Sequence, residues 1–350
     1  MPQLPLGFLW GAATAPHQVE GNNVNSDWWA LEQTMPGMQH RAMIDTALDL
    51  GLTPVVTLHH FTQPRWFADV GGWMGDQGIE RFAAYVREAA GILDGVEWVC
   101  TINEPNMLAL MVGMSRAAQS GDIETWTSPT VEGVTRPVLP DPDPKVAARL
   151  AEAHDAAREV LKQRTGAAVG WTVACQAYTA TPGNEEKLRE VSYVREDLYL
   201  EAARGDDFIG VQSYSSQAVD ENGVVPHPKR PDNTMTGDAY RPDAIGIAVR
   251  HTWETTGGVP ILITENGIAT ADDSRRIAYT SEALDHLFAA MDDGIDVRGY
   301  IHWSALDNFE WGHWEPTFGL IEVDRRAFDR RPKPSLAWLG ETARSSITRS

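Results

Sequence analysis

The chain has 350 residues and is 43% hydrophobic, so it can bury a sizeable core; one barrel domain of about 250 residues with insertions fits residues 1–350. Its 29 Lys and Arg residues against 49 Asp and Glu residues give a formal net charge of -20, and no basic block offsets it. Such a chain repels a nucleic-acid backbone and an anionic membrane surface, so we expect neither as a partner. The substrate is expected to be neutral or cationic.

The N-terminus and the cysteines indicate the compartment. The segment MPQLPLGFLWGAATA has no basic residue before its short apolar stretch, and no run of about 18 apolar residues follows it. Only two cysteines occur, Cys100 and Cys175, which favours buried free thiols in a reducing compartment over a disulfide framework. We therefore expect a cytoplasmic protein.

In chain order, short apolar runs alternate with helical patterns. Seven runs predict strands, mostly apolar on both faces as buried parallel strands are: Phe8–Ala13, Thr53–Leu58, Trp98–Asn103, Ala168–Ala174, Phe208–Gln212, Pro260–Thr264 and Val297–His302. Helices are predicted at Gln39–Leu50, Ile79–Ile92, Lys145–Arg164, Glu185–Ala203, Asp243–Thr255 and Thr280–Asp292. This alternation favours a parallel barrel or a doubly wound sheet. Because no GxGxxG or GxxxxGK[ST] turn occurs, we predict the (β/α)8 barrel of the α/β class.

Two polar, proline-rich stretches interrupt this pattern, Ser120–Pro144 and Val219–Pro242. Both carry few periodic apolar residues, which predicts long surface loops on the side where strands lead into helices. Loops in that place would form the rim of a pocket.

Polar or aromatic side chains follow several predicted strands: His59, His60, Asn103, Glu104, Tyr214, Glu265, Asn266 and Trp303. In a parallel barrel the carboxyl ends of the strands share one face, where barrel enzymes assemble their sites. Glu104 in WVCTINEPN and Glu265 in PILITENGI would meet there although they are far apart in the sequence. Two carboxyl groups are the minimal apparatus for glycoside hydrolysis, one as a protonated acid and the other as a nucleophile or a base.

Tryptophan is abundant, with 13 residues in the chain, and Trp303, Trp311 and Trp314 gather at the last predicted strand and the loop after it. Their flat apolar faces can stack on the C–H surfaces of a sugar. Acceptors for hydroxyl groups, among them Glu310, are interleaved with them. This mixture suits a carbohydrate ligand.

Neither a metal site nor a catalytic serine triad is predicted. His59 and His60 are adjacent, so they point to opposite sides of an extended chain, and no HExxH-type pattern completes a ligand set. No GxSxG motif occurs. We expect no metal and no cofactor.

Five motifs, in order, resemble glycoside hydrolase family 1, the β-glucosidase family: FLWGAATAPHQVEG, TLHHFTQPRWF, TINEPN, ITENGIA and IHWSALDNFEWGHWEPTFGLIEVDR. The resemblance extends through nearly the whole chain. It implies that Glu104 is the acid/base and Glu265 the nucleophile. It further implies that Asn103 donates to the sugar 2-hydroxyl and that Tyr214 hydrogen-bonds the nucleophile.

The resemblance also implies a site for the glycone, the sugar that is released. Gln18, His60 and Glu310 would clamp its hydroxyls, Trp303 would form the stacking floor, and Trp311 would donate a hydrogen bond from its indole. Family members that act on 6-phosphosugars usually replace the carboxylate that Glu310 retains. A neutral glycone is therefore implied, with glucose, galactose and fucose all left open.

The predicted function is that of a retaining exo-β-glycosidase, which removes terminal β-D-glycosyl residues by two displacements. Its substrates would be small neutral β-glycosides or oligosaccharides, and assembly into a homo-oligomer is left open. The alternative is a degenerate barrel that binds sugars with little or no turnover.

The chain departs from the family pattern between Glu32 and Gln39, where about one βα unit is absent. This absence accounts for seven predicted strands where eight are needed. The family arginine that supports the nucleophile has no counterpart, since Arg41 falls in a predicted helix and Arg65 in a loop motif. Three explanations stay open: further chain absent from the printed sequence, a shortened protein, or a partner that fills the gap.

Two smaller departures concern the site. Gln212 stands in VQSYS where many members have asparagine, and Phe61 stands where a tryptophan often follows His60. The first keeps an amide and the second keeps an apolar wall, so neither change threatens the predicted reaction.

Overall fold

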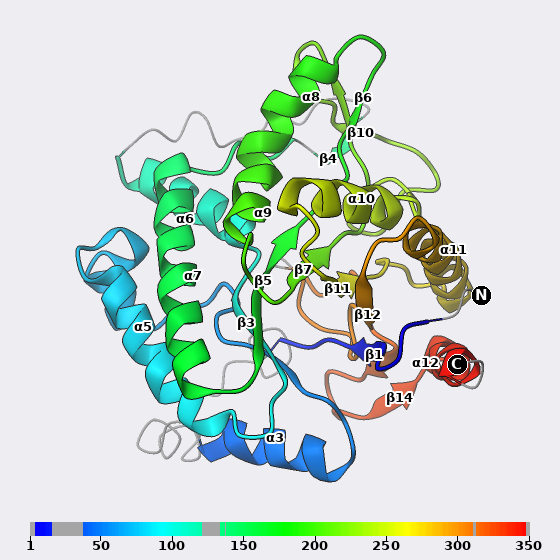
Figure 1. Cartoon of the computed structure of the whole chain (residues 1–350). Coiled ribbons are helices and arrows are strands. Elements are labelled where there is room, and N and C mark those ends of the chain that lie inside the picture. Colours follow the sequence, from blue (N-terminus) through cyan, green and yellow to red (C-terminus); the bar gives the residue numbers. More distant parts are fainter. Residues whose placement is uncertain (1–3, 16–37, 121–133, 137, 311–312, 348–350) are drawn as a thin grey trace.

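The structure, a computed structural model, describes residues 4–15, 38–120, 134–136, 138–310 and 313–347. Its centre is one sheet of seven parallel strands with helices around it (Figure 1). In spatial order these strands are β1 (Leu9–Ala12), β12 (Val297–His302), β11 (Ile261–Asn266), β7 (Ile209–Gln212), β5 (Ala168–Ala174), β3 (Trp98–Asn103) and β2 (Val55–Thr57).

All seven predicted strands are present. Strands β3, β5 and β12 begin and end at the predicted residues, whereas β11 continues to Asn266, beyond the predicted end at Thr264. The sheet curls into an incomplete barrel, consistent with the predicted (β/α)8 fold (Figure 1). Strands β1 and β2 lie at its two ends, and no ladder joins them within the described ranges. The predicted gap between Glu32 and Gln39 lies almost wholly outside the described residues.

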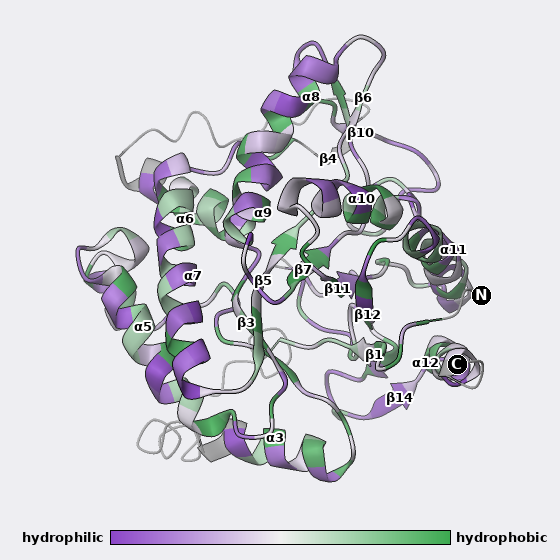
Figure 2. Cartoon of the chain, in the orientation of Figure 1, coloured by the Kyte–Doolittle hydropathy of each residue, from purple (hydrophilic) through white to green (hydrophobic). Residues whose placement is uncertain are grey.

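Helices cover the outside of the sheet. Their bounds are α3 (Met38–Asp49), α4 (Arg65–Asp69), α5 (Gly78–Ala89), α6 (Pro105–Ser120), α7 (Pro144–Arg164), α8 (Glu185–Ser192), α9 (Leu198–Ala202), α10 (Ala244–Thr256), α11 (Asp273–Asp292) and α12 (Pro334–Ile347). Helix α5 packs against α7, and α10 packs against α11. Helices α5, α7 and α11 carry both hydrophilic and hydrophobic residues (Figure 2), as expected for one face on the sheet and one in solvent.

Acidic caps fix where the two longest helices begin. The side chain of Asp143 accepts hydrogen bonds from two backbone N–H groups in the first turn of α7, at 2.8 and 3.2 Å. Pro144 follows at the first helical position, where a missing N–H costs nothing. Asp272 caps α11 in the same way, accepting from the N–H of Ser274 at 2.9 Å.

Several helices differ from the prediction. Helices α6 and α12 were not predicted, and α11 begins at Asp273 rather than Thr280. Helix α6 packs against both β5 and α7, so it is apolar on several sides and lacks the amphipathic period that indicates a helix. The predicted helix Glu185–Ala203 is divided into α8, a π-helical turn at Tyr193–Asp197, and α9.

The two predicted loops contain short strands, which corrects the interpretation of them as irregular chain. Strand β4 (Val134–Arg136) of the first loop pairs antiparallel with β10 (His227–Pro228) of the second. Strands β8 (Ala218–Asp220) and β9 (Gly223–Val224) form a small sheet with β6 (Thr179–Ala180). Strands of two or three residues are too short to show an alternating pattern in the sequence.

The core has three parts, one of which gathers Ala15, Ala269, Trp303 and Phe318. Cys100, Phe208, Leu262 and Ile301 form a cluster of residues from the strands and their starts, separate from the larger cluster where the strands pack on the helices. Cys100 and Cys175 are buried free thiols, as predicted, and burial raises the pKa of Cys100 to about 12. Among the described helices none is long and apolar enough to cross a membrane.

Candidate active site

The two candidate glutamates lie at one end of the sheet. Glu104 directly follows β3, and Glu265 lies near the end of β11. Because the seven strands are parallel, both residues are at the carboxyl edge, where barrel enzymes place their sites. Each residue is only 7% exposed, so both carboxyl groups are largely withdrawn from water.

Glu265 interacts with a tyrosine and with the other glutamate. The hydroxyl of Tyr214 donates to Oε2 of Glu265 at 2.5 Å, and the hydroxyl of Tyr279 donates to the backbone carbonyl of Tyr214 at 2.7 Å. Burial and the negative charge of Glu104 raise the pKa of Glu265 well above its ordinary value, whereas the Tyr214 hydrogen bond lowers it. The influence of Glu104 on this pKa shows that the two carboxyl groups lie within interaction range.

Glu104 is held in an uncommon backbone conformation. Its φ is 42°, in the left-handed region that residues other than glycine rarely adopt. Its N–H donates to the carbonyl of Thr172 at 2.8 Å. Two residues later, Asn106 Nδ2 donates to the carbonyls of Ala174 at 2.8 Å and Arg195 at 2.9 Å. These bonds tie the turn that carries Glu104 to β5 and to the π-helical turn.

Asn103 precedes Glu104 and is 2% exposed. Its Oδ1 accepts from Thr172 Oγ1 at 3.0 Å and from Gln212 Nε2 at 2.8 Å. Its Nδ2 is buried and has no hydrogen-bond partner among the described residues. The amide therefore keeps one donor group available beside Glu104.

Trp303, His60 and Glu310 form a third part of the site. The indole Nε1 of Trp303 donates to Oε1 of Glu310 at 2.7 Å, and both residues are 4% exposed. The imidazole of His60 stacks on Trp303 with ring centroids 6.1 Å apart and planes 14° from parallel. Burial raises the pKa of Glu310 to about 7, against the lowering effect of the Trp303 hydrogen bond.

The structure sorts the remaining candidates. Gln18 and Trp311 lie outside the described residues. His59 packs against Trp73 in the core, and burial lowers its pKa to about 4, so it is a core histidine rather than a site residue. Asn266 is buried and donates to the backbone carbonyl of Ser213 at 2.7 Å, which is a structural role.

Three residues of the site were missed from the sequence: Thr172, Asn106 and Tyr279. Thr172 and Tyr279 bond the amide of Asn103 and the backbone of Tyr214, whereas Asn106 bonds the backbone of Ala174 and Arg195. Thr172 lies inside a strand and Tyr279 inside a helix, where nothing in the sequence separates them from core residues. Asn106 stands in the motif TINEPN, which was a usable signal.

The family model for glycosyl hydrolase family 1 matches residues 34–126 and 196–347, which is more than half of the chain and includes both glutamates. The chain belongs to glycosyl hydrolase family 1. This confirms the resemblance found in the sequence motifs.

Three similar proteins show how far the likeness extends. The solved apo structure of a β-glucosidase named 1317 is 35% identical, with a TM-score of 0.80 over 97% of this chain and 98% of that chain. The chloroplastic β-glucosidase-like protein SFR2 of Oryza sativa subsp. japonica is 27% identical over 94% of this chain, which spans only 51% of that protein's length. Thermostable β-glucosidase B of Thermobispora bispora is 24% identical over 99% of this chain and 92% of that protein.

The alignment with the Thermobispora bispora protein extends over 452 positions, although this family 1 chain has only 350 residues. Long gaps therefore fall on the side of this chain, so the relative contains segments that this chain lacks. That difference fits the absence of about one βα unit inferred from the motifs.

Neither arginine near the gap takes the place of the missing family arginine. Arg41 pairs with Asp45 at 2.6 Å on α3 and lies near the carbonyl of Ile92, on a segment that leads into the amino end of β3. Arg65 is exposed at the start of α4. Apart from burial, the main influences on the pKa of Glu265 are Glu104, Tyr214 and Glu310, so the described residues provide it with carboxylates and a hydroxyl rather than with a cation.

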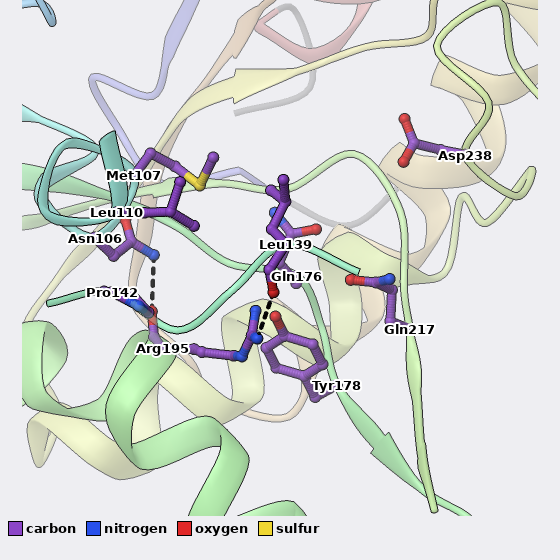
Figure 3. Close-up of a pocket in the computed structure, with 10 residues that line it drawn as sticks. All are labelled: Asn106, Met107, Leu110, Leu139, Pro142, Gln176, Tyr178, Arg195, Gln217 and Asp238. Atoms are coloured by element: carbon purple, nitrogen blue, oxygen red, sulfur yellow. Dashed lines mark hydrogen bonds between the residues drawn. The ribbon is translucent and has the colours of Figure 1, made fainter. Parts of the chain in front are cut away.

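A small cavity lies beside Asn106 at the same end of the sheet. It is enclosed by Met107 and Leu110 on one side and by Gln217 and Asp238 on the other (Figure 3). Its volume of about 30 Å³ holds roughly two water molecules, so it is too small for a sugar. Within the described part of the chain, no group of three or more His, Cys, Asp or Glu side chains could hold a metal ion.

Proposed function

We propose that this family 1 glycoside hydrolase is a retaining exo-β-glycosidase that acts on small neutral β-glycosides or oligosaccharides. The observation that carries the proposal is the buried pair of Glu104 and Glu265, which interact electrostatically while only Glu265 accepts a hydrogen bond from Tyr214. Two carboxyls in distinct surroundings are what an acid and a nucleophile require.

The reaction proceeds in two displacements. Glu265 attacks the anomeric carbon while Glu104 gives its proton to the leaving oxygen, which forms a covalent glycosyl ester on Glu265. Glu104 then removes a proton from water, and the water oxygen displaces Glu265 from the anomeric carbon. Since each step inverts the anomeric centre, the sugar leaves with its original configuration.

The pair must share one proton in the resting enzyme. Because the two carboxyls repel one another inside a buried site, their double ionisation is disfavoured near neutral pH. The Tyr214 hydroxyl stabilises the anion on Glu265 at 2.5 Å. This hydrogen bond favours the anion on Glu265, which is the state that the first displacement needs.

The glycone would stack on Trp303, with His60 and Glu310 as partners for its hydroxyls. Gln18 and Trp311 belong to the same proposal on the strength of the motifs alone. A β-glucosidase is favoured because the family 1 relatives named above include β-glucosidases, and galactose and fucose remain candidate glycones. Retaining Glu310, a buried carboxyl, disfavours a phosphorylated sugar because the two anions would repel.

The roles are tested by azide rescue of two variants on an aryl β-glucoside with a good leaving group. Glu104→Ala should still form the glycosyl ester, and azide should then give the β-glycosyl azide. Glu265→Ala should lose nearly all turnover, and azide should attack the substrate directly and give the α-glycosyl azide. Product configuration is read by NMR.

Swapped azide products would reverse the two roles. An unmodified chain that binds glucosides but does not turn over any aryl β-glucoside would support the alternative, a degenerate sugar-binding barrel. The missing second-strand segment is the feature that favours that alternative.

A further inference from the structure

The amide of Asn103 is fixed by two donors that converge on its oxygen. Thr172 Oγ1 donates at 3.0 Å from the neighbouring strand β5, where Thr172 is the register partner of Asn103. Gln212 Nε2 donates at 2.8 Å from the end of β7. With both donors in place, the oxygen of Asn103 is occupied and its nitrogen is turned away from them.

All three residues are almost completely buried, at 1 to 2% exposure. Asn103 Nδ2 has no partner among the described residues, and neither has Gln212 Oε1. A buried amide donor without a partner costs roughly 1–3 kcal/mol, so it is retained only where something else binds it. Asn103 lies next to Glu104, which places this free donor at the reacting end of the site.

We propose that Thr172 and Gln212 are positioning residues, which turn the Asn103 amide so that its nitrogen, not its oxygen, faces the sugar 2-hydroxyl. The inference rests on the proposed glycosidase function. A glutamine at position 212 reaches from β7 across β5 to β3, a span that uses its extra methylene compared with the asparagine common at this place in the family.

Thr172 also couples this orientation to the acid/base. Its carbonyl accepts the N–H of Glu104 at 2.8 Å, while its hydroxyl donates to Asn103 at 3.0 Å. One strand residue therefore sets both the turn that carries Glu104 and the direction of the neighbouring amide. The 2-hydroxyl contact strengthens as the sugar approaches the transition state, so its loss lowers kcat more than it raises KM.

The test compares kcat/KM for an aryl β-glucoside and its 2-deoxy counterpart on the same enzyme preparation. Thr172→Val and Gln212→Met each remove one donor with little change of shape. Each should lower the ratio of the two kcat/KM values about tenfold, which is the effect of about one hydrogen bond. Asn103→Ala removes the amide itself and should give the lowest ratio. Thr172→Ser keeps the hydroxyl, so its ratio should equal that of the unmodified enzyme.

A ratio of two substrates does not depend on how much of a variant is folded, so partial misfolding leaves the test intact. Thr101→Val is the matched control. Thr101 lies on β3, the strand of Asn103, and its hydroxyl bonds His154 at 2.7 Å rather than Asn103. It should change both substrates equally. If Thr172→Val and Gln212→Met also change both substrates equally, the two residues only support the structure and the proposal fails.

A binding measurement separates this inference from the proposed function. The Kd values of glucose and 2-deoxyglucose are measured by calorimetry, which requires no turnover. Suppose that the unmodified chain is inactive, and that the ratio of the Kd of 2-deoxyglucose to the Kd of glucose is smaller in the two donor variants than in the unmodified chain. The proposed function then fails and the positioning role stands. If the preference is the same with and without the donors, the positioning role fails whatever the activity.

Discussion

At the scale of single residues, Tyr214 is the side chain that favours the anion on Glu265, as the proposed mechanism requires. It is the only described side chain with a hydrogen bond to Glu265 in the structure, and its effect opposes both burial and the charge of Glu104. No described cation lies beside Glu265, so the stabilisation of its anion depends more on Tyr214 than it would if an arginine were present. A single substitution can therefore show how much the ionisation of Glu265 depends on Tyr214.

Tyr214→Phe removes the bond that lowers the pKa of Glu265, so that pKa should rise further. The nucleophile acts only when it is deprotonated, so the acid limb of the kcat/KM profile should move to higher pH. At fixed neutral pH, kcat/KM should fall roughly 10- to 100-fold, the effect of losing a hydrogen bond to a charged group. The profile is measured with an aryl β-glucoside.

Tyr240→Phe is the control for this change. Tyr240 also donates to a carboxylate, Glu282, at 3.3 Å, but this bond is exposed on the surface. Its profile should match that of the unmodified enzyme. An acid limb that stays in place in Tyr214→Phe would mean that Glu265 is not the group whose ionisation limits the rate.

Residue by residue, the sequence indicates candidate site residues at strand ends better than the residues that hydrogen-bond to them. Glu104 and Glu265 could be found because a charged residue directly after an apolar strand is conspicuous. Thr172 could not, since a threonine inside a buried strand is ordinary until the structure shows its hydroxyl on Asn103. The hydrogen bond between Trp303 and Glu310 was also not predicted, although both residues were.

At the scale of elements, the turn from β3 into α6 is held from outside by the π-helical turn between α8 and α9. Asn106 Nδ2 donates to the carbonyl of Arg195 in that turn, and Asn106 Oδ1 accepts the N–H of Ala174 at 3.3 Å. The uncommon φ of Glu104 persists only because neighbouring elements enforce it. A π-helical turn often marks a functional position, and here it provides a carbonyl that Asn106 binds, two residues after Glu104.

Asn106→Leu removes these bonds and leaves buried backbone groups unpaired, so it should cost about 1–3 kcal/mol of stability. Its effect on activity should depend on the leaving group. A dinitrophenyl glucoside needs little protonation and should react almost normally, whereas an alkyl glucoside should react more than tenfold more slowly because Glu104 is displaced. Stability is measured by urea unfolding and rates by substrate hydrolysis.

The control is Asn233→Leu, since Asn233 also bridges two carbonyls, those of Pro228 and Gly237, in a different loop from the turn that carries Glu104. It should affect both leaving groups alike. Equal losses for both substrates in Asn106→Leu would show that Asn106 supports the fold without aiming Glu104.

The elements themselves differ in how well the sequence predicts them. Strand β3 lies between Glu97 and Glu104, so its limits follow from the sequence. Helix α6 was missed because it is buried on several sides, and β4 and β10 because each is only two or three residues long. Periodicity describes a half-exposed element of adequate length, and these elements do not meet that condition.

At the scale of the whole molecule, the open sheet is the feature that determines whether the site can be fully active. Strands β1 and β2 end the sheet order, and within the described ranges each pairs on one side only. An unpaired strand edge offers a row of backbone donors and acceptors, so both edges are open to pairing with further chain. A further segment of chain, or a second copy of the protein, would cover them.

Mass spectrometry and light scattering of the purified protein distinguish these cases. A polypeptide mass well above 38.6 kDa would reveal a further βα unit, and with it the expected arginine. If the polypeptide mass is 38.6 kDa, a particle of twice that mass would indicate that a second copy covers β1 and β2.

If the polypeptide mass is 38.6 kDa, Glu265 has no cation beside it among the described residues, so its anion is less favoured. We then expect turnover orders of magnitude below that of the Thermobispora bispora enzyme assayed in parallel on the same aryl glucoside. Equal turnover from a verified 38.6 kDa chain would show that the arginine is not needed here, and that the hydroxyl of Tyr214 is sufficient to keep the nucleophile ionised.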